Sequence, residues 1–252
     1  MTATWVAHAV FQARRGYDEQ PCSGQLVIVD QAGPIWTIEC DVCGFEAGLP
    51  ASEADPASRR RLQLEQADRW RRASGIPAQL RDWTLERIGL GVKPQVLAAA
   101  RAWAAGESRG LLLSGPVGVG KTSLAAAAAS ARLRQVPVRW LSVPALFAKL
   151  GLAFADEERH DALRILVAQT AIVLDDIDKS RPSDYAAEQL FLAIDSRVNA
   201  GASLLVTTNL ALSQLAERFP EPYGEAIASR LVGYCPSFAL EGHDRRTEGV
   251  AA

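Results

Sequence analysis

No stretch of this sequence comes near the ~18 consecutive apolar residues that a membrane-spanning helix needs. The sequence also lacks a large charge of one sign, because 27 Lys and Arg nearly balance 29 Asp and Glu. That balance excludes a uniformly basic, histone-like surface but still allows a local basic patch. Near the N-terminus the basic residues follow the apolar stretch, which is the reverse of a secretory signal. We therefore expect a cytoplasmic protein.

Internal repeats are also absent, and composition divides the 252 residues into regions. Residues 1–50 hold three of the four cysteines and two β-prone runs, QLVIVD and PIWTIEC, around a Gly-Pro turn. Residues 51–75 are rich in arginine and predict a linker that leads into a solvated helix, although a partner-binding or nucleic-acid-binding role for that helix stays open. Residues 76–247 form the main domain, and residues 248–252 a tail.

The main domain alternates helical patterns with short apolar runs, which are GLLLS, PVRWLS, AIVLD, SLLVTT and SFAL. Strands that are continuously apolar and alternate with helices predict a parallel sheet covered on both faces. The expected fold class is therefore α/β, with a parallel five-stranded sheet flanked by helices. Apolar residues make up 48% of the chain, which is enough for a real core.

The first apolar run is followed by GPVGVGKT, which fits the phosphate-loop pattern G-x-x-x-x-G-K-[ST]. Three glycines allow the backbone to curl its N–H groups around a phosphate, and the helix that follows adds its N-terminal dipole. The lysine is expected to reach the β- and γ-phosphates of ATP, and the threonine hydroxyl to bind Mg²⁺. The predicted ATP-binding residues are Gly115, Pro116, Val117, Gly118, Val119, Gly120, Lys121, Thr122 and Ser123.

Polar side chains end two further apolar runs. Asp175 ends AIVLD and is expected beside the phosphate loop, on the neighbouring strand, where it can hold Mg²⁺ together with Thr122. Asp176 can orient or deprotonate the attacking water. Asn209 follows SLLVTT, and its amide can hydrogen-bond the γ-phosphate or that water. Arg230 can act on the nucleotide of a neighbouring subunit, or it can be an ordinary surface arginine.

Taken together, GPVGVGKTS, IVLDDID, LLVTTN and ASRL…GHDRR resemble the AAA+ ATPases, in particular the DnaC-type (DnaC/DnaI/IstB-like) replicative helicase loaders. The lead-in SGIPAQLRDWTLERI resembles the segment of that family that packs near the adenine. The resemblance implies that Asn209 is the first sensor, Arg230 the trans-acting finger and Arg246 the second sensor, with Arg245 as the alternative. Most AAA+ proteins have Glu where this chain has Asp176, so the expected hydrolysis is slow and regulatory.

The same resemblance places a contact with single-stranded DNA after the second strand. Lys149 can pair with a phosphate there, and Phe154 can stack on a base. The competing interpretation is that Phe147, Leu150 and Phe154, which recur at helical spacing, belong to the core.

Cysteine spacing in the first region indicates zinc in preference to a disulfide. Cys40 and Cys43 form a CxxC pair followed by glycine, and Cys22 offers a third thiolate. His8 is the first candidate for the fourth ligand and Glu19 the second, although the cysteines can also pack as small hydrophobic residues. Several loaders carry a small zinc-containing N-terminal domain that grips the helicase, which is the role that this resemblance implies for residues 1–50.

These observations favour an ATP-dependent loader that self-associates through its ATP site and places a hexameric DnaB-type helicase on single-stranded DNA. ATP and Mg²⁺ are the expected cofactors, with Zn²⁺ in the N-terminal region. The first alternative is an IstB-type transposition regulator that binds duplex DNA. The second alternative is a small-molecule P-loop kinase, which the strand-terminal TTN and the SRL helix disfavour.

Overall fold

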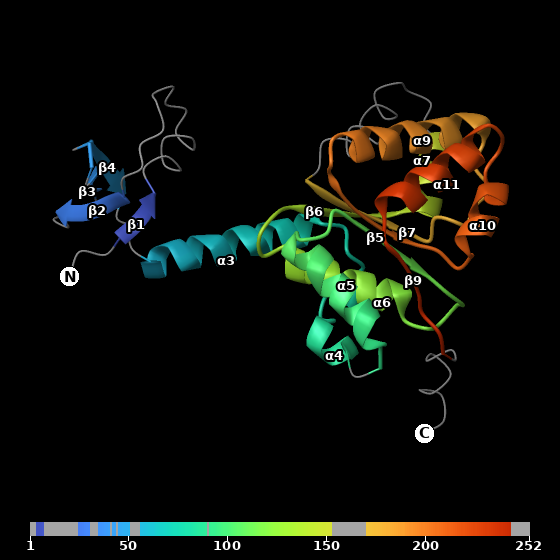
Figure 1. The fold of residues 1–252 in the computed structure, drawn as a ribbon, viewed down its shortest axis with the longest axis horizontal. Helices are drawn as coiled ribbons and strands as arrows, with labels where there is room; N and C mark the ends of the chain where they lie inside the picture. Colours follow the sequence, from blue (N-terminus) through green and yellow to red (C-terminus); the bar gives the residue numbers. More distant parts are fainter. Residues whose placement is uncertain are drawn as a thin grey trace. The chain divides into compact units, whose positions relative to one another are not determined.

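The computed structural model describes residues 4–7, 25–30, 35–40, 42–43, 45–50, 56–89, 91–152 and 170–242. Within the chain two compact units are present, Met1–Gln66 and Ala67–Ala252 (Figure 1). The unit boundary falls inside one helix, α3 (Pro56–Ala73), which occupies most of the arginine-rich region. Six residues singled out in the sequence lie outside the described residues, namely His8, Glu19, Cys22, Phe154, Arg245 and Arg246.

The first unit contains a four-stranded antiparallel sheet in the order β1-β2-β3-β4. Its inner strands are the two β-prone runs of the sequence, and the outer strands had no clear signal there. Cys40 ends the third strand, and its N–H donates a hydrogen bond of 2.8 Å to the Phe45 carbonyl, which closes the turn that carries Cys43. The four strands are β1 (Thr4–Ala7), β2 (Gln25–Asp30), β3 (Ile35–Cys40) and β4 (Glu46–Pro50).

The second unit is built on a five-stranded sheet, which confirms the fold class predicted from the sequence. All of its strand pairs are parallel, and their order is β6-β7-β8-β5-β9. The strands are β5 (Gly110–Ser114), β6 (Val138–Ser142), β7 (Ala171–Asp175), β8 (Ser203–Thr207) and β9 (Ser237–Ala239). The order corrects one expectation, because Asp175 is not on the strand next to the phosphate loop. Strand β8 lies between β5 and β7.

Helices cover both faces of this sheet (Figure 1). Strand residues alternate between two cores, so that Leu111 and Leu113 pack with α5 and α6 while Leu112 packs with α9 and α11. No described helix is long and apolar enough to cross a membrane. The helices are α4 (Leu85–Gly89), α5 (Pro94–Ala105), α6 (Lys121–Arg132), α7 (Val143–Leu152), α9 (Asp184–Asn199), α10 (Leu212–Leu215) and α11 (Tyr223–Tyr234), with 3-10 turns η1 (Ala78–Leu80) and η2 (Ala216–Arg218).

Small side chains bring the helix after the phosphate loop close to the sheet. The five consecutive alanines of α6, residues 125–129, are all at most 1% exposed. Alanine favours helix and adds little bulk, so the helix axis can approach the strands closely. The position of Lys121 and Thr122 at the first turn of α6 is therefore fixed by a tightly packed element.

The segment after α3 attaches to the edge of the sheet. The Trp140 N–H of β6 donates to the Ser74 carbonyl at 2.7 Å, and the Arg139 side chain donates to the Ala73 carbonyl at 2.6 Å. Trp70 packs partly against the same core. The end of α3 therefore belongs to the second unit by its contacts. Arg69, Arg71 and Arg72, in contrast, are exposed, as the solvated-helix interpretation expects.

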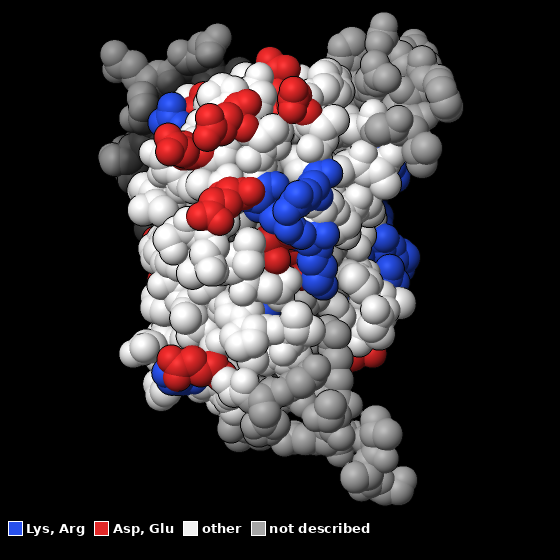
Figure 2. Space-filling model, turned by 90° about the vertical axis from the view of Figure 1, so that its right-hand side faces the viewer, with Lys and Arg blue, Asp and Glu red and all other residues white. Residues whose placement is uncertain are grey.

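Charges of both signs share the surface, in keeping with the small net charge. On the face shown in Figure 2, several Lys and Arg side chains gather near the middle with Asp and Glu above and beside them, and further basic side chains lie toward the edges. A local basic patch therefore exists although the whole chain carries a net charge of only −2.

A glycine in α11 provides a test of the packing. A Cβ at Gly224 would overlap the Ala216 carbonyl oxygen of η2, whereas a Cβ at Gly233 in the same helix meets nothing within 4 Å. We expect Gly224→Ala to destabilise the protein by about 1–3 kcal/mol through overpacking. Gly233→Ala should be neutral or stabilising by up to about 1 kcal/mol, because alanine is the better helix former. Thermal unfolding of the two variants checks this, and equal melting temperatures would contradict the packing of α11 on η2.

Candidate active site

The phosphate-loop glycines adopt the backbone that only glycine takes readily. Gly115, Gly118 and Gly120 have φ angles of +136°, +83° and +99°. A Cβ at Gly115 would also overlap the Leu240 carbonyl oxygen, which follows β9. Because α6 begins at Lys121 directly after this turn, the loop and the helix N-terminus form one anion-binding corner.

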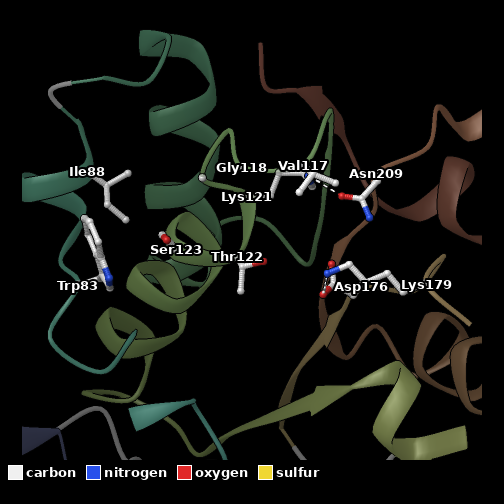
Figure 3. A pocket seen from close by; sticks show the side chains of 11 residues that line it. Trp83, Ile88, Val117, Gly118, Lys121, Thr122, Ser123, Asp176, Lys179 and Asn209 are labelled. Atoms are coloured by element: carbon white, nitrogen blue, oxygen red, sulfur yellow. Dashed lines mark hydrogen bonds and ion pairs between the residues drawn. The ribbon is translucent and has the colours of Figure 1, made fainter. Parts of the chain in front are cut away.

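Lys121 lies at the centre of this corner and is only 4% exposed. Its Nζ donates hydrogen bonds to the Gly115 carbonyl at 2.7 Å and to the Pro116 carbonyl at 2.7 Å. A third bond runs to Asn209 Oδ1 at 2.9 Å (Figure 3). Burial lowers the pKa of Lys121, and the nearby carboxylates of Asp176 and Asp178 oppose that shift. The buried ammonium is thus held by acceptors from the loop and from the end of β8.

Asp175 faces the loop across β8. Its Oδ1 accepts a hydrogen bond from the Thr207 hydroxyl at 2.7 Å and another from the Thr122 hydroxyl at 3.2 Å. Burial raises the pKa of this carboxyl group, and the two hydroxyl hydrogen bonds oppose the shift. The strand end of β7 and the first turn of α6 are therefore in direct contact at the predicted metal position.

The chemistry of these two groups fits Mg²⁺, which prefers oxygen ligands and binds through few protein groups together with phosphate oxygens. Thr122 offers a hydroxyl and Asp175 a carboxylate, and the hydrogen bond between them shows that they converge on one point. They are the residues that would hold the ion, which would neutralise charge on the phosphates.

Asp176 has an unusual backbone, with a φ angle of +58°. Its N–H donates to the Thr207 hydroxyl at 2.9 Å, and its Oδ2 forms an ion pair of 2.5 Å with Lys179. Figure 3 shows this pair on the opposite side of the pocket from Trp83. The ion pair gives Asp176 a cationic partner within its own loop. Lys179 was not among the site residues predicted from the sequence.

Asp178 is a second residue that sequence reasoning missed. It is 5% exposed, and its carboxylate accepts from the Asn209 N–H at 2.8 Å and from Asn209 Nδ2 at 3.0 Å. Asp178 and Lys179 are the last two residues of the motif DDIDK, but the motif does not indicate which strand end their side chains contact. Asn209, the predicted sensor residue, is therefore held in place by the loop that follows the adjacent strand β7.

An apolar wall closes the other end of the pocket. Trp83 and Ile88, from the lead-in segment, line it opposite the phosphate loop (Figure 3). The Arg87 guanidinium lies 4.6 Å from the centre of the Trp83 ring, which orients that ring. A planar base suits this wall and phosphates suit the loop. The pocket is lined by Trp83, Ile88, Val117, Gly118, Gly120, Lys121, Thr122, Ser123, Asp176, Lys179 and Asn209.

The structure places two other predicted residues away from this pocket. Arg230 lies on α11, is exposed, and forms an ion pair of 2.6 Å with Asp195 of α9. Lys149 lies exposed on α7 and lines a separate cavity beside β6 together with Arg139. Phe147 and Leu150 are buried in the core, as the core interpretation of that helix expects.

The proposed zinc ligands are described only in part. Cys40, at the end of β3, is buried, and Cys43, in the β3–β4 turn, is exposed. Within the described ranges, which omit His8, Glu19 and Cys22, no group of three or more His, Cys, Asp and Glu is placed to hold a metal. Zinc therefore stays a prediction. Cys235 is buried, and burial raises the pKa of its thiol to about 12, so this residue behaves as a small hydrophobic group.

A phosphate loop after β5, an acidic residue at the end of β7 and a polar residue after the intervening β8 define the class of this unit. It is a P-loop domain of the AAA+ class, with its ligand pocket at the carboxyl ends of the strands.

Comparison with known proteins identifies the family. Residues 92–249 match the family described as IstB-like ATP binding protein. The chain therefore belongs to the IstB-like ATP-binding proteins. No curated protein matches it.

Solved structures share the fold at low identity. The chain is similar to DnaI, with 22% identity, coverage of 67% of this chain and 96% of that one, and a TM-score of 0.59. It is similar to the DnaC helicase loader, with 23% identity, 66% and 100% coverage and a TM-score of 0.56. A replication initiator, DnaA bound to AMPPCP and single-stranded DNA, matches at 15% identity with 68% and 52% coverage and a TM-score of 0.57.

The buried carboxyl of Asp175 leads to a prediction about stability and pH. Because burial raises its pKa, the folded protein binds this proton more tightly than the unfolded chain does. Charged Asp175 therefore costs stability above its folded pKa, and the cost disappears as the pH falls through that value. Without nucleotide or Mg²⁺, we expect Asp175→Asn to melt about 2–4 °C higher at pH 7.5, the shift that ~1 kcal/mol produces in a domain of this size.

The gain from Asp175→Asn should shrink in melts at progressively lower pH. Asp82→Asn, a change at an exposed aspartate of the same unit, is the control and should leave the melting temperature unchanged at every pH. A melting temperature for Asp175→Asn below that of the wild type at pH 7.5 would contradict the stated cost of this buried charge.

Proposed function

We propose that this protein is a Mg²⁺-dependent ATPase that loads a hexameric DnaB-type replicative helicase onto single-stranded DNA. The observation that carries the ATPase part is the convergence of Lys121, Thr122 and Asn209 on one pocket, with Asp175 accepting a hydrogen bond from the Thr122 hydroxyl. The loader part is supported by the fold that the chain shares with DnaI and the DnaC helicase loader.

The residues divide the chemistry among them. Lys121 binds the β- and γ-phosphates, and Asn209, which already contacts Lys121, lies beside the γ-phosphate position. Asp176 orients the attacking water and accepts its proton. An aspartate is one methylene shorter than glutamate, and here it is also paired with Lys179, so hydrolysis is slow and acts as a timer.

Arg230 completes the site of a second copy. It is exposed on α11 and its partner Asp195 is on the neighbouring helix, so the guanidinium is available at the surface of the unit. Delivered to a neighbouring nucleotide, it would neutralise charge that develops during phosphoryl transfer. The proposed assembly is therefore an oligomer in which ATP joins the subunits.

The remaining parts of the proposal concern partners. The first unit, with its exposed Val42 at the β3–β4 turn, would bind the helicase, and zinc held by Cys40, Cys43, Cys22 and His8 would stabilise it. Lys149 and Phe154 would contact the single strand. Arg246, or Arg245, would act as the second sensor.

An IstB-type regulator of transposition is the second candidate, and the family match over residues 92–249 favours it. It would use the same ATP pocket but bind duplex DNA and a transposase. Binding of fluorescent single-stranded and duplex DNA at one salt concentration separates the two, because affinities depend strongly on salt. A clear preference for duplex would favour this candidate over the loader.

Removal of the phosphate-binding lysine tests the ATP site. Lys121→Ala should weaken ATP binding by about 10- to 100-fold, the expected loss of charge-assisted hydrogen bonds. Lys93→Ala is the matched control, since Lys93 is exposed and paired with Glu241 outside the pocket. Calorimetric titration measures both. If Lys121→Ala binds ATP as tightly as the wild type does, the proposed ATP site is wrong.

Mixed subunits test whether Arg230 acts in trans. Arg230→Ala alone should lower turnover by about 10³-fold, as loss of such an arginine does in other P-loop enzymes. Lys121→Ala alone should be inactive. Mixing the two should restore phosphate release, because the arginine of one variant then serves the nucleotide of the other. Failure of the mixture to exceed either variant alone would show that Arg230 does not act across subunits.

Deletion of the first unit tests the helicase contact. The deletion should end at residue 66, because residues 67–75 pack on the ATPase unit. The shortened chain should still bind ATP but should no longer co-elute with a DnaB-type hexamer in ATP and single-stranded DNA. Unchanged co-elution would refute this role of the N-terminal unit.

A further inference from the structure

Asn209 sits in an environment that fixes which way its amide points. A carboxylate can only accept hydrogen bonds and an ammonium can only donate them. Asp178 therefore accepts a hydrogen bond from Asn209 Nδ2 at 3.0 Å, and Lys121 donates one to Asn209 Oδ1 at 2.9 Å. Figure 3 shows the oxygen of this amide turned toward Lys121. Among the partners described for it, the amide is oriented by charge at both ends.

Asp178 holds Asn209 by two hydrogen bonds, not one. Its second carboxylate oxygen accepts the Asn209 backbone N–H at 2.8 Å, so both the main chain and the side chain of Asn209 are fixed. The carboxylate is 5% exposed, and in this setting a hydrogen bond between charged and polar groups is strong. The row Asp178, Asn209, Lys121 thus links the loop after β7, the end of β8 and the first turn of α6.

The backbone of Asp178 is itself anchored from outside the sheet. Arg218 Nε, at the end of η2, donates to the Asp178 carbonyl oxygen at 2.6 Å. This bond crosses from the turn before α11 to the loop after β7. It restrains the carboxylate without touching Asn209 or Lys121.

On this basis we infer that Asp178 is a positioning residue: it orients Asn209 so that Asn209 presents Lys121 to the terminal phosphate, and Arg218 keeps Asp178 in place. The inference rests on the proposed ATPase function. If Asp178 positions Asn209 and, through it, Lys121, the protein should bind a nucleoside triphosphate more tightly than a diphosphate, because Lys121 reaches the γ-phosphate.

The isosteric variant Asp178→Asn separates positioning from a purely structural role. Asparagine keeps the shape and can still accept the Asn209 backbone N–H, so the turn is preserved. Its own NH₂ group, however, then faces Asn209 Nδ2, and two donors cannot pair. A residue that only shapes the turn would tolerate this change, whereas a residue that orients the amide would not.

The experiment measures the dissociation constants of ADP and of ATPγS, and the rate of phosphate release from ATP, for full-length wild type, Asp178→Asn, Asn209→Ala and the double variant. We expect each single variant to lower the preference for ATPγS over ADP by about fivefold, the worth of one hydrogen bond. Turnover should fall by about tenfold, as expected when a reacting group is misplaced. The double variant should match the single variants within about twofold, because both act on one row.

Arg218→Gln provides a second arm that leaves the Asp178 side chain intact. It should lower the ATPγS preference in the same direction. Arg109→Gln is its matched control, since Arg109 also donates to a backbone carbonyl, that of Gly201 at 3.1 Å, but precedes β5 at the opposite end of the sheet. The control should keep the wild-type preference and turnover.

The outcomes distinguish this inference from the proposed function. If the wild type binds ATPγS but Asp178→Asn behaves like it, or if the effects of the two single variants multiply, the positioning role is overturned and the ATP site stands. If the wild type binds nucleotide without releasing phosphate, hydrolysis is refuted and the ratio of the two affinities still decides the role of Asp178. If the wild type binds neither nucleotide, both proposals fail.

Discussion

The structure of the second unit depends on one electrostatic constraint, the burial of the Lys121 ammonium at the carboxyl ends of the strands. A buried cation needs acceptors, and this one has two loop carbonyls and an amide oxygen in contact. The carboxylates of Asp176 and Asp178, in the loop after β7, and of Asp175, at the end of that strand, add favourable interactions with it. The glycine loop, the strand order and the Asn209 amide all bring these groups to one place.

The same constraint accounts for the central position of β8. This strand separates the strand of the phosphate loop from that of Asp175, yet its terminal residues bridge both. Thr207 binds Asp175 through its hydroxyl, and Asn209 binds Lys121 through its amide. Strand β8 therefore sets the spacing between Lys121 and Asp175, the residues proposed to bind phosphate and metal. Neutral polar side chains suit that task, because they accept from the cation side and donate to the acidic side without adding charge.

Sequence reasoning succeeded where the physical signal was local. Continuous apolar runs predicted the strands of the parallel sheet, and the spacing of the glycines predicted the phosphate loop. It failed where partners came from distant segments. Neither the clamp of Asp178 on Asn209 nor the place of β8 has a local signature, and Arg132 and Arg197, which resemble surface residues in their helices, are buried and bind Ser203. Long-range pairing of polar groups is decided by the sheet order, which composition does not encode.

The contact between Gly115 and the Leu240 carbonyl has a consequence for how the chain is made. The Leu240 N–H also bonds the Ser114 carbonyl at 2.8 Å, so the segment after β9 forms one side of the phosphate loop. During synthesis, the loop emerges more than a hundred residues before this wall exists. A nascent chain halted before residue 237 would carry the complete glycine motif without its supporting strand. The phosphate loop is therefore expected to reach its supported form only after the segment that follows β9 has been translated.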